Sequence, residues 1–360
     1  MMRTHKRCWL ALPFSTFLTL FPLVLLALGL NQPAWAQVAC LTASDMGPNA
    51  VSTLENTAKR YFQMAAAGDS ASLQQNSIPA LAASFGGVQA AINDHKEQFA
   101  GAQSTVRTPY VLEASGTAPL QHAEFFCGIY NSPDRVGFSI PNLPPGTYAV
   151  VIQDVNTAKA GRYSISMVLQ DTSAPGASSA QSASPEAALA TATWKLAGYY
   201  VRPETLNGHD GQWFLQKARQ YKAQGQTLNA YYYYIEARQL ISPVDFMGTP
   251  QLDQLYDETQ QVVPKDMPVN GPVDNVMAGQ TYKLAQVFPV PVGQELDLVI
   301  KYQVPDISNT TQTFQQNMAL IKAFVAKYPQ VRDAFDAVVA RAVAPSGQDY
   351  GSMLPMKEIK

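Results

Sequence analysis

The first half of the chain changes from a helical to a strand-like pattern of apolar positions near residue 100. Between residues 51 and 67 apolar side chains return every three or four positions, which predicts an amphipathic helix that ends at Gly68. Ser52 and Glu55 have the spacing of a capping box at its start. A second helix is expected up to residue 100, with Val88, Ile92 and Phe99 on one face.

After residue 100, six runs rich in Val, Ile, Tyr and Phe alternate with turn residues, from "TVRTPYVLEA" to "TWKLAGYYVRP". They predict an antiparallel sheet. Between the last two runs, residues 171–189 contain few large apolar side chains and bury too little surface to offset their ordering entropy. We expect a mobile hairpin loop there. The alternative, a linker between domains, would leave the final strand without a sheet to join.

The helical period returns in residues 207–262. Two helices are expected on either side of Gly225, and Pro243 stops the second. Their apolar faces carry Phe214, Ala218 and Tyr221 in the first helix and Ala230, Tyr233, Tyr234, Ala237 and Leu240 in the second. A third helix, capped by Thr249 with Pro250 at its first position, is expected to cover one side of this hairpin.

Residues 265–360 are expected to form a small α+β unit. Two strands, "TYKLAQVFPV" and "ELDLVIKYQV", precede two predicted amphipathic helices. The helical stripes are Phe314, Met318, Ile321 and Val325, then Val331, Phe335, Val338 and Ala342. The fold class that follows is α+β: N-terminal helices packed on a curved antiparallel sheet, then a helical hairpin, then this C-terminal unit.

Residues 1–36 read as a secretory signal peptide. Three basic residues precede an apolar run, and the small residues Ala34 and Ala36 mark a cleavage site after Ala36. The alternative is a membrane anchor, since the apolar run is long for a signal core. Pro13 and Pro22 within the run favour removal. We therefore expect export, with the periplasm as the compartment, and no membrane span after the signal is removed.

Removal of the signal leaves two cysteines, Cys40 and Cys127. An even number of cysteines in an oxidising compartment predicts one disulfide between them. Two separate buried thiols are the first alternative. The second is a lipid on Cys40, because "QVAC" resembles a bacterial lipoprotein signal, although Gln37 stands where such signals prefer Leu. A lipid on Cys40 and the disulfide exclude each other.

The charge balance excludes two classes of partner. Residues 1–36 hold three basic and no acidic residues, so 22 basic and 27 acidic residues remain and the mature charge is −5. Nucleic acids and anionic membranes both require clusters of Lys and Arg, and no such cluster follows residue 36. A protein or an envelope component is the partner we expect.

No sequence motif of a catalytic, metal or cofactor site occurs in the chain, and we expect no cofactor. The histidines His95, His122 and His209 are too dispersed to predict a metal site. His209 and Asp210 form an acid–base pair in sequence, but Asp210 and Asn207 read more simply as helix caps at a junction. The run Tyr231–Tyr234 covers every side of a helix, so most of it must be core and one ring is left for a groove.

Two resemblances add to this reading. Helices followed by a sheet that ends in "WKLAGYYV" resemble the nuclear transport factor 2-like, or cystatin-like, cone fold over residues 50–203. Residues 207–242 resemble a single tetratricopeptide hairpin, with Phe214, Ala218, Tyr221, Gly225, Ala230, Tyr234 and Ala237 at matching positions. Cone proteins use their cavity for catalysis or for binding, so the fold leaves the function open. The tetratricopeptide resemblance implies partner contacts on the open face of the first helix, at Gln212, Leu215, Arg219 and Lys222.

The sequence thus favours a secreted, non-enzymatic binding or scaffold protein. One alternative is an isomerase, lyase or ligand-binding protein of the cone-shaped superfamily. Catalysis of that kind needs an acid or base with a shifted pKa in an apolar cavity, and the predicted strands direct few ionisable residues inward. Another alternative is an envelope lipoprotein anchored through Cys40.

Overall fold

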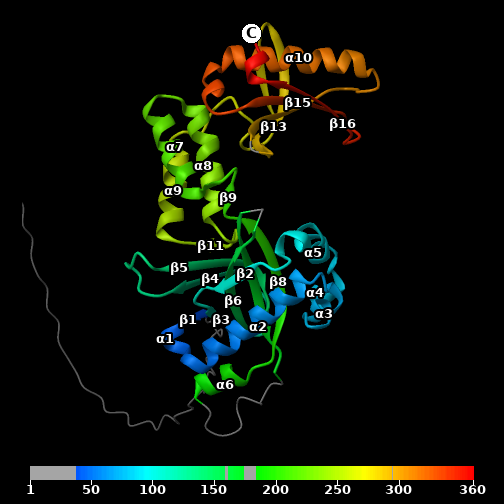
Figure 1. The fold of residues 1–360 in the computed structure, drawn as a ribbon. Helices are drawn as coiled ribbons and strands as arrows, with labels where there is room; N and C mark the ends of the chain where they lie inside the picture. The colour runs from blue at the N-terminus through cyan, green and yellow to red at the C-terminus, as the bar shows by residue number, and fades with distance from the viewer. Residues whose placement is uncertain (1–37, 159–160, 174–183, 294) are drawn as a thin grey trace, which may run out of the picture. The chain divides into compact units, whose positions relative to one another are not determined.

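The computed structural model describes residues 38–158, 161–173, 184–293 and 295–360 (Figure 1). The fold class is α+β, as predicted. The predicted signal peptide lies outside the described residues. Within the described ranges, no helix is both long and apolar enough to cross a membrane.

The N-terminal part is built on a large antiparallel sheet with strand order β1-β3-β6-β7-β8, and β2 also pairs with β6. Its strands are β1 (Val38–Leu41), β2 (Gln103–Val106), β3 (Tyr110–Ala114), β6 (Gly146–Asn156), β7 (Arg162–Asp171) and β8 (Trp194–Pro203). The helices are α1 (Ala43–Met46), α2 (Pro48–Ala66), α3 (Ser70–Gln75), α4 (Pro79–Ala83), α5 (Gly86–Phe99) and α6 (Pro185–Thr191). The predicted capping box at Ser52 falls inside α2, which begins earlier, at Pro48.

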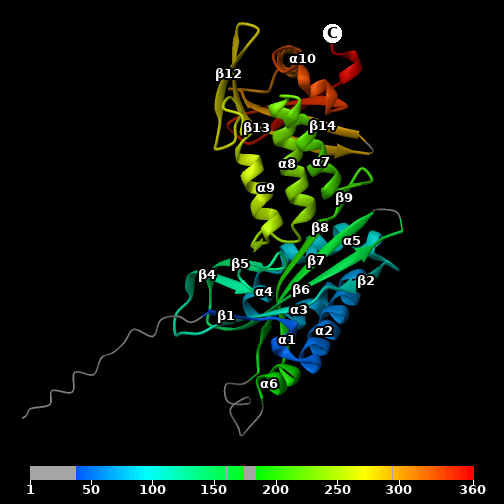
Figure 2. The same ribbon diagram turned by 90° about the vertical axis from the view of Figure 1, so that its left-hand side faces the viewer.

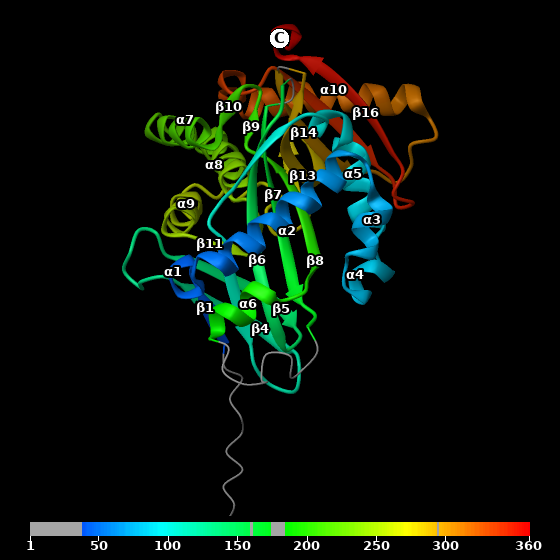
Figure 3. The same ribbon diagram turned by 60° about the horizontal axis from the view of Figure 1, so that its bottom comes forward.

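Both faces of the large sheet are buried, which explains the almost continuous apolar runs of β6 and β7. Ala149, Val151 and Val155 pack against α2 and α5, and Figure 3 shows α2 lying across the strands. The intervening residues Val150 and Ile152 belong to a second core on the other face. Because successive side chains of a strand point to opposite faces, one strand serves both cores.

A second, smaller sheet covers that other face, where the sequence predicted only one sheet. It has the order β11-β5-β4, with β4 (Leu120–Cys127), β5 (Val136–Leu143) and β11 (Met247–Gly248). Phe125 and Phe138 of this sheet are each 1% exposed and pack on the large sheet. The apolar outer face of β6 and β7 must be covered by another layer. Strands β4 and β5 form that layer, and for this reason they do not join the large sheet.

The prediction of a mobile loop over residues 171–189 is wrong for its last residues. Its residues 174–183 lie outside the described part of the chain, but residues from Pro185 onward form α6, which packs against α2. The Ser184 hydroxyl caps α6 by accepting from the Ala187 amide, and Leu189 is buried. Ala-rich "PEAALA" is a good helix former, so its low complexity concealed a helix.

The helical region follows the prediction. It consists of α7 (Gly211–Ala223), α8 (Thr227–Ile241) and α9 (Pro250–Gln260), preceded by the short strands β9 (Thr205–Leu206) and β10 (His209–Asp210). Figure 2 shows the three helices side by side. Gly225 ends the first helix with φ +75°, a conformation that glycine adopts without strain. The Thr249 hydroxyl caps α9 as expected.

The C-terminal unit is a five-stranded sheet, β12-β13-β14-β15-β16, with α10 on it. The elements are β12 (Val273–Met277), β13 (Gln280–Val292), β14 (Glu295–Gln303), α10 (Thr310–Lys327), η1 (Pro329–Asp333), β15 (Ala337–Val343), β16 (Asp349–Pro355) and η2 (Met356–Glu358). Because β14 and β15 are parallel, α10 forms the crossover that a parallel pair requires.

The second predicted C-terminal helix is wrong. Its stripe from Val331 to Ala342 falls on η1 and on strand β15. In β15, Val338, Ala340 and Ala342 are fully buried while the residues between them are partly exposed. This period of two is that of a strand, and alanines at two of the buried positions hid the difference from a helical stripe.

One apolar core joins the three helices to the C-terminal sheet. Backbone carbonyls after α10 accept hydrogen bonds from the helical hairpin: Tyr221 donates to Asp333 at 2.7 Å and Tyr233 to Ala334 at 2.9 Å. The hairpin therefore packs on the sheet, as a single helical pair must to bury both of its faces.

Candidate functional site

A cleft with a volume of about 810 Å³ lies between α8 and β13. We call it the α8–β13 cleft. One wall comes from Tyr231, Tyr232, Ile235, Glu236 and Gln239 of α8. The facing wall is mainly apolar and includes Met267, Val287, Phe288 and Pro289. Small-molecule sites have this size and this combination of an apolar lining with a few polar groups.

Glu236 is the unusual residue of this cleft. It is only 8% exposed, yet within the part of the chain that the structure describes its carboxylate has no hydrogen bond and no ion pair. Neither oxygen is among the fully enclosed unpaired atoms, so the carboxylate keeps access to the cleft that it lines. Burial raises the pKa of Glu236 from its ordinary 4.5 to about 7, because a poorly hydrated carboxylate is costly.

The other charged groups of the cleft neutralise each other. Arg202, at the end of β8, lies 2.6 Å from the carboxylate of Asp245, which precedes β11. Both residues line the cleft. Since this pair is internally balanced, Glu236 is left as the uncompensated charge.

The four consecutive tyrosines of α8 divide into two pairs. Tyr233 donates to Ala334 O at 2.9 Å and Tyr234 donates to Glu258 at 3.0 Å, so both fix the helix in the core. Tyr231 and Tyr232 are also buried, but they line the cleft, and no partner of their hydroxyls lies among the described residues. Burial raises the pKa of both phenols. The hydroxyls therefore stay neutral at physiological pH and can bond a ligand.

The predicted partner-binding face of α7 is open only in part. Gln212 is exposed, but Leu215 is 4% exposed and belongs to the core. Arg219 binds both oxygens of Glu258 in α9, at 2.7 and 2.8 Å, and Lys222 donates to Gln261 at 2.5 Å. The hydrogen bonds from Arg219 help to lower the pKa of Glu258 to about 2. Partner contacts at these four residues stay a prediction, and they would compete with α9.

The junction before α7 is structural, as its sequence suggested. The Asp210 carboxylate caps α7 by accepting from the Trp213 amide at 2.9 Å. His209 stacks on Trp213 with ring centroids 3.8 Å apart. Asn207 has φ +52° and donates to Glu295 O at 2.9 Å, so it fastens the turn to the C-terminal sheet instead of capping the helix.

The remaining histidines do not form a site. His95 bonds Ala91 O and stacks on Phe99, so it packs more than a solvated face would. His122 is an exposed residue of β4. Among the described residues, no group of three or more His, Cys, Asp or Glu side chains could hold a metal ion.

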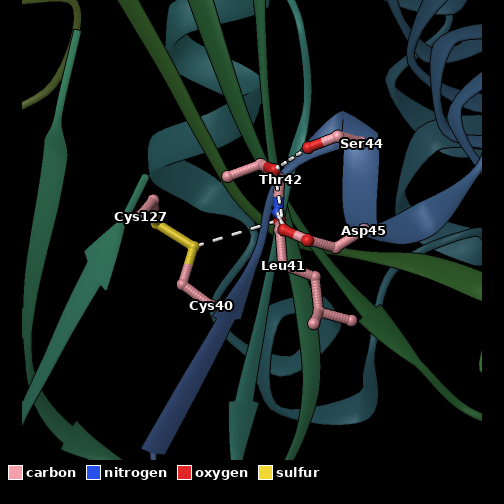
Figure 4. The surroundings of a disulfide bond; sticks show 6 residues. All are labelled: Cys40, Leu41, Thr42, Ser44, Asp45 and Cys127. Atoms are coloured by element: carbon pink, nitrogen blue, oxygen red, sulfur yellow. Dashed lines mark hydrogen bonds between the residues drawn. A yellow bond between two sulfur atoms is a disulfide. The ribbon is translucent and has the colours of Figure 1, made fainter. Parts of the chain in front are cut away.

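Cys40 and Cys127 form the predicted disulfide, with Cα atoms 5.2 Å apart. Figure 4 shows the bond beside the start of α1, where Thr42 and Asp45 form a capping box. It joins β1 of the large sheet to β4 of the small sheet. Because both sulfurs are used, Cys40 offers no thiol to a lipid in this structure.

The space between the large sheet and its helices holds buried side chains without a carboxylate. Tyr61, Phe62 and Phe99 are each at most 5% exposed, and the Tyr61 hydroxyl donates to Trp194 O at 2.8 Å. The buried carboxylates of the described residues are Glu236 and Asp297, both outside residues 50–203. Among its described residues, the region for which the sequence predicted a cone domain therefore offers no buried carboxyl group.

Glu236 lies within the "AYYYYIEAR" run, but the sequence did not predict it as a site residue. The sequence feature that could have identified Glu236 is its position as a single acidic residue four positions after Tyr232, on a helix with apolar side chains on all sides. No family model matches the chain, and neither a curated protein nor a solved structure does.

Proposed function

We propose that the chain is an exported, non-enzymatic binding protein of the cell envelope, and that the α8–β13 cleft is its binding site. The observation that carries the proposal is Glu236, a buried carboxylate without a partner on the wall of a cleft of about 810 Å³. Groups that cost stability and break the rules of packing are concentrated at functional sites. A ligand that bonds this carboxylate would remove the cost.

Export is supported by the signal-like residues 1–36 and by the Cys40–Cys127 disulfide, since such bonds persist in oxidising compartments. The periplasm is the compartment that we propose. The resemblances to the cone fold and to a tetratricopeptide hairpin are compatible with a binding role. In our proposal, however, the hairpin contributes through α8 and not through the outer face of α7.

The test is native mass spectrometry of the full chain, exported and purified from a Gram-negative periplasm. We expect a mature chain that begins after Ala36, an intact disulfide and a bound small molecule or envelope fragment. The exposed cleft residue Gln239 offers a control, because Gln239→Trp should fill the cleft without disturbing the core. A bound species that Gln239→Trp retains would contradict the site. Retention of residues 1–36 would contradict export by signal removal, and a lipid on Cys40 would establish the lipoprotein alternative.

A second function is favoured by the same residue. A carboxyl group with a pKa of about 7 suits a general base at neutral pH, as an isomerase or lyase would need. It ranks second because, in the described residues, no second proton-transfer group is bonded to Glu236. Incubation of the co-purified ligand with wild type and Glu236→Gln distinguishes the two. Chemical conversion by wild type alone supports an enzyme, and unchanged ligand supports a binding protein.

A further inference from the structure

We infer that the α8–β13 cleft binds an amphipathic organic cation, a small molecule whose protonated amine lies on Glu236 and whose apolar body lies along β13. This inference rests on the proposed binding function and specifies its ligand.

The charges around the cleft select a cation. The ionisable groups that face it are Glu236, Tyr231 and Tyr232 from α8, Arg202 from β8, and Asp245 from the segment before β11. The segment at Met267 and strand β13 contribute no ionisable side chain to the lining. Next to this wall, Asp266 acts on Tyr232 and is paired with Lys327 at 3.6 Å, and Lys301 lies over the Phe288 ring. Arg202 and Asp245 are paired at 2.6 Å and the phenols are neutral, so the cleft has a net charge of −1 when Glu236 is ionised. The ionised Glu236 carboxylate would repel an anion that binds beside it.

The hydrogen-bonding groups match an ammonium ion. A carboxylate accepts from an N–H donor, and such charge-assisted bonds are about twice as strong as neutral ones. The hydroxyls of Tyr231 and Tyr232 line the same cleft and can accept hydrogen bonds from other N–H or O–H groups of the ligand. Because Glu236 is only 8% exposed, its carboxylate has less hydration to lose when the cation binds than an exposed carboxylate would.

The facing wall suits an apolar body. Val287, Phe288 and Pro289 of β13 and Met267 supply aliphatic and aromatic surface opposite α8. Methionine and aromatic side chains accommodate flat or irregular apolar groups. The volume of about 810 Å³ is in the range of small-molecule sites.

Binding must depend on pH in a defined direction. The cation needs the ionised form of Glu236, whose pKa burial raises to about 7 in the free protein. Affinity should therefore be highest above pH 7 and should decline as pH falls below it. Between pH 8 and pH 6 the ionised fraction drops about tenfold, which sets the expected loss of affinity.

The experiment is isothermal titration calorimetry of the purified mature protein at pH 8 and pH 6. Three probes of similar size differ in charge: 2-phenylethylammonium, neutral 2-phenylethanol and anionic 3-phenylpropionate. Glu236→Gln removes the charge of the cleft, Asp257→Asn removes an exposed charge of α9 outside it, and Gln239→Trp fills the cleft.

We expect 2-phenylethylammonium to bind more tightly than the other two probes at pH 8. Glu236→Gln should weaken its binding about 10- to 100-fold, as for a hydrogen bond to a charged group, whereas Asp257→Asn should change it less than threefold. Failure of the ammonium probe to bind overturns the inference, as does equal binding by Glu236→Gln. If the neutral or anionic probe binds better and Gln239→Trp abolishes that binding, the inference fails while the proposed binding site stands. Binding that Gln239→Trp leaves intact contradicts the site itself.

Discussion

Replacement of Glu236 by Gln should stabilise the protein at alkaline pH and leave it almost unchanged at acid pH. Burial raises the pKa of Glu236 in the folded chain from 4.5 to about 7. Below pH 4.5 the carboxyl group is protonated in both the folded and the unfolded chain, so its ionisation costs nothing. Between pH 4.5 and pH 7 the unfolded chain releases the proton while the folded chain keeps it, so the free energy of unfolding falls as pH rises.

The size of the effect follows from the same values. A tenfold change in an equilibrium constant corresponds to about 1.4 kcal/mol. The rise in the pKa of Glu236 from 4.5 to about 7 therefore lowers the free energy of unfolding by about 3 kcal/mol above pH 7. At pH 5 most of this cost is absent. Gln cannot ionise, so Glu236→Gln should gain about 2 to 3 kcal/mol over wild type at pH 8 relative to the difference at pH 5.

Urea unfolding followed by circular dichroism at pH 5, 6, 7 and 8 measures this difference. Comparing the two pH values removes any constant cost of burying the Gln amide. The control Asp257→Asn removes an exposed carboxylate instead of a buried one. Parallel pH profiles for wild type and Glu236→Gln would show that Glu236 ionises in the folded chain without penalty, contrary to this prediction.

Three further changes test how the site is supported. Gly211→Ala should lower the stability of the protein by about 1 to 3 kcal/mol in thermal unfolding. The new Cβ would lie 2.5 Å from the Ile241 side chain and 3.0 Å from a backbone oxygen of α8. In the control Gly87→Ala the new Cβ meets no atom within 4 Å, so this variant should not be destabilised. Reduction of the disulfide, which closes a separation of 87 residues, should lower the denaturation midpoint by an amount that corresponds to at most about 4 to 5 kcal/mol. Arg219→Met should cost about 1 kcal/mol at pH 7 in urea unfolding, and this loss should vanish as pH falls from 4.5 towards 2, where its carboxylate partner protonates.

For each of these three predictions, one experimental result would contradict it. Equal stabilities of the two glycine variants would show that the contact between α7 and α8 can relax. An unchanged midpoint after verified reduction would remove the disulfide from the account of stability. A loss in Arg219→Met that persists at pH 2 would show that it arises from the packing of the side chain and not from the ion pair.

Where side chains repeat at a clear period, the sequence was sufficient. Phe214, Ala218 and Tyr221 are spaced as in one helical face and are buried as predicted. The cap at Asp210 and the disulfide were also predictable, because each depends on local geometry or on a count of two cysteines. These features need no knowledge of distant contacts.

Where the secondary structure or the sheet arrangement depends on contacts between distant residues, the predictions from the sequence were wrong. The residues of β15 read equally well as a helix until β14 is placed beside them, and the separation of β4 and β5 into a second sheet follows from the need to cover β6 and β7. The candidate site shows the same limit. Glu236 becomes part of a cleft only because β13, which is distant in the sequence, lies beside α8.

The most direct measurement is the NMR titration of the Glu236 side-chain carboxyl carbon, assigned with Glu236→Gln, in the mature protein with and without 2-phenylethylammonium. We predict a pKa of about 7 for Glu236 in the free protein, and a lower pKa when the cation is added, because the ligand stabilises the ionised form. A pKa near the ordinary 4.5 that the cation leaves unchanged would show that this carboxylate is neither buried from water nor the group that binds the cation.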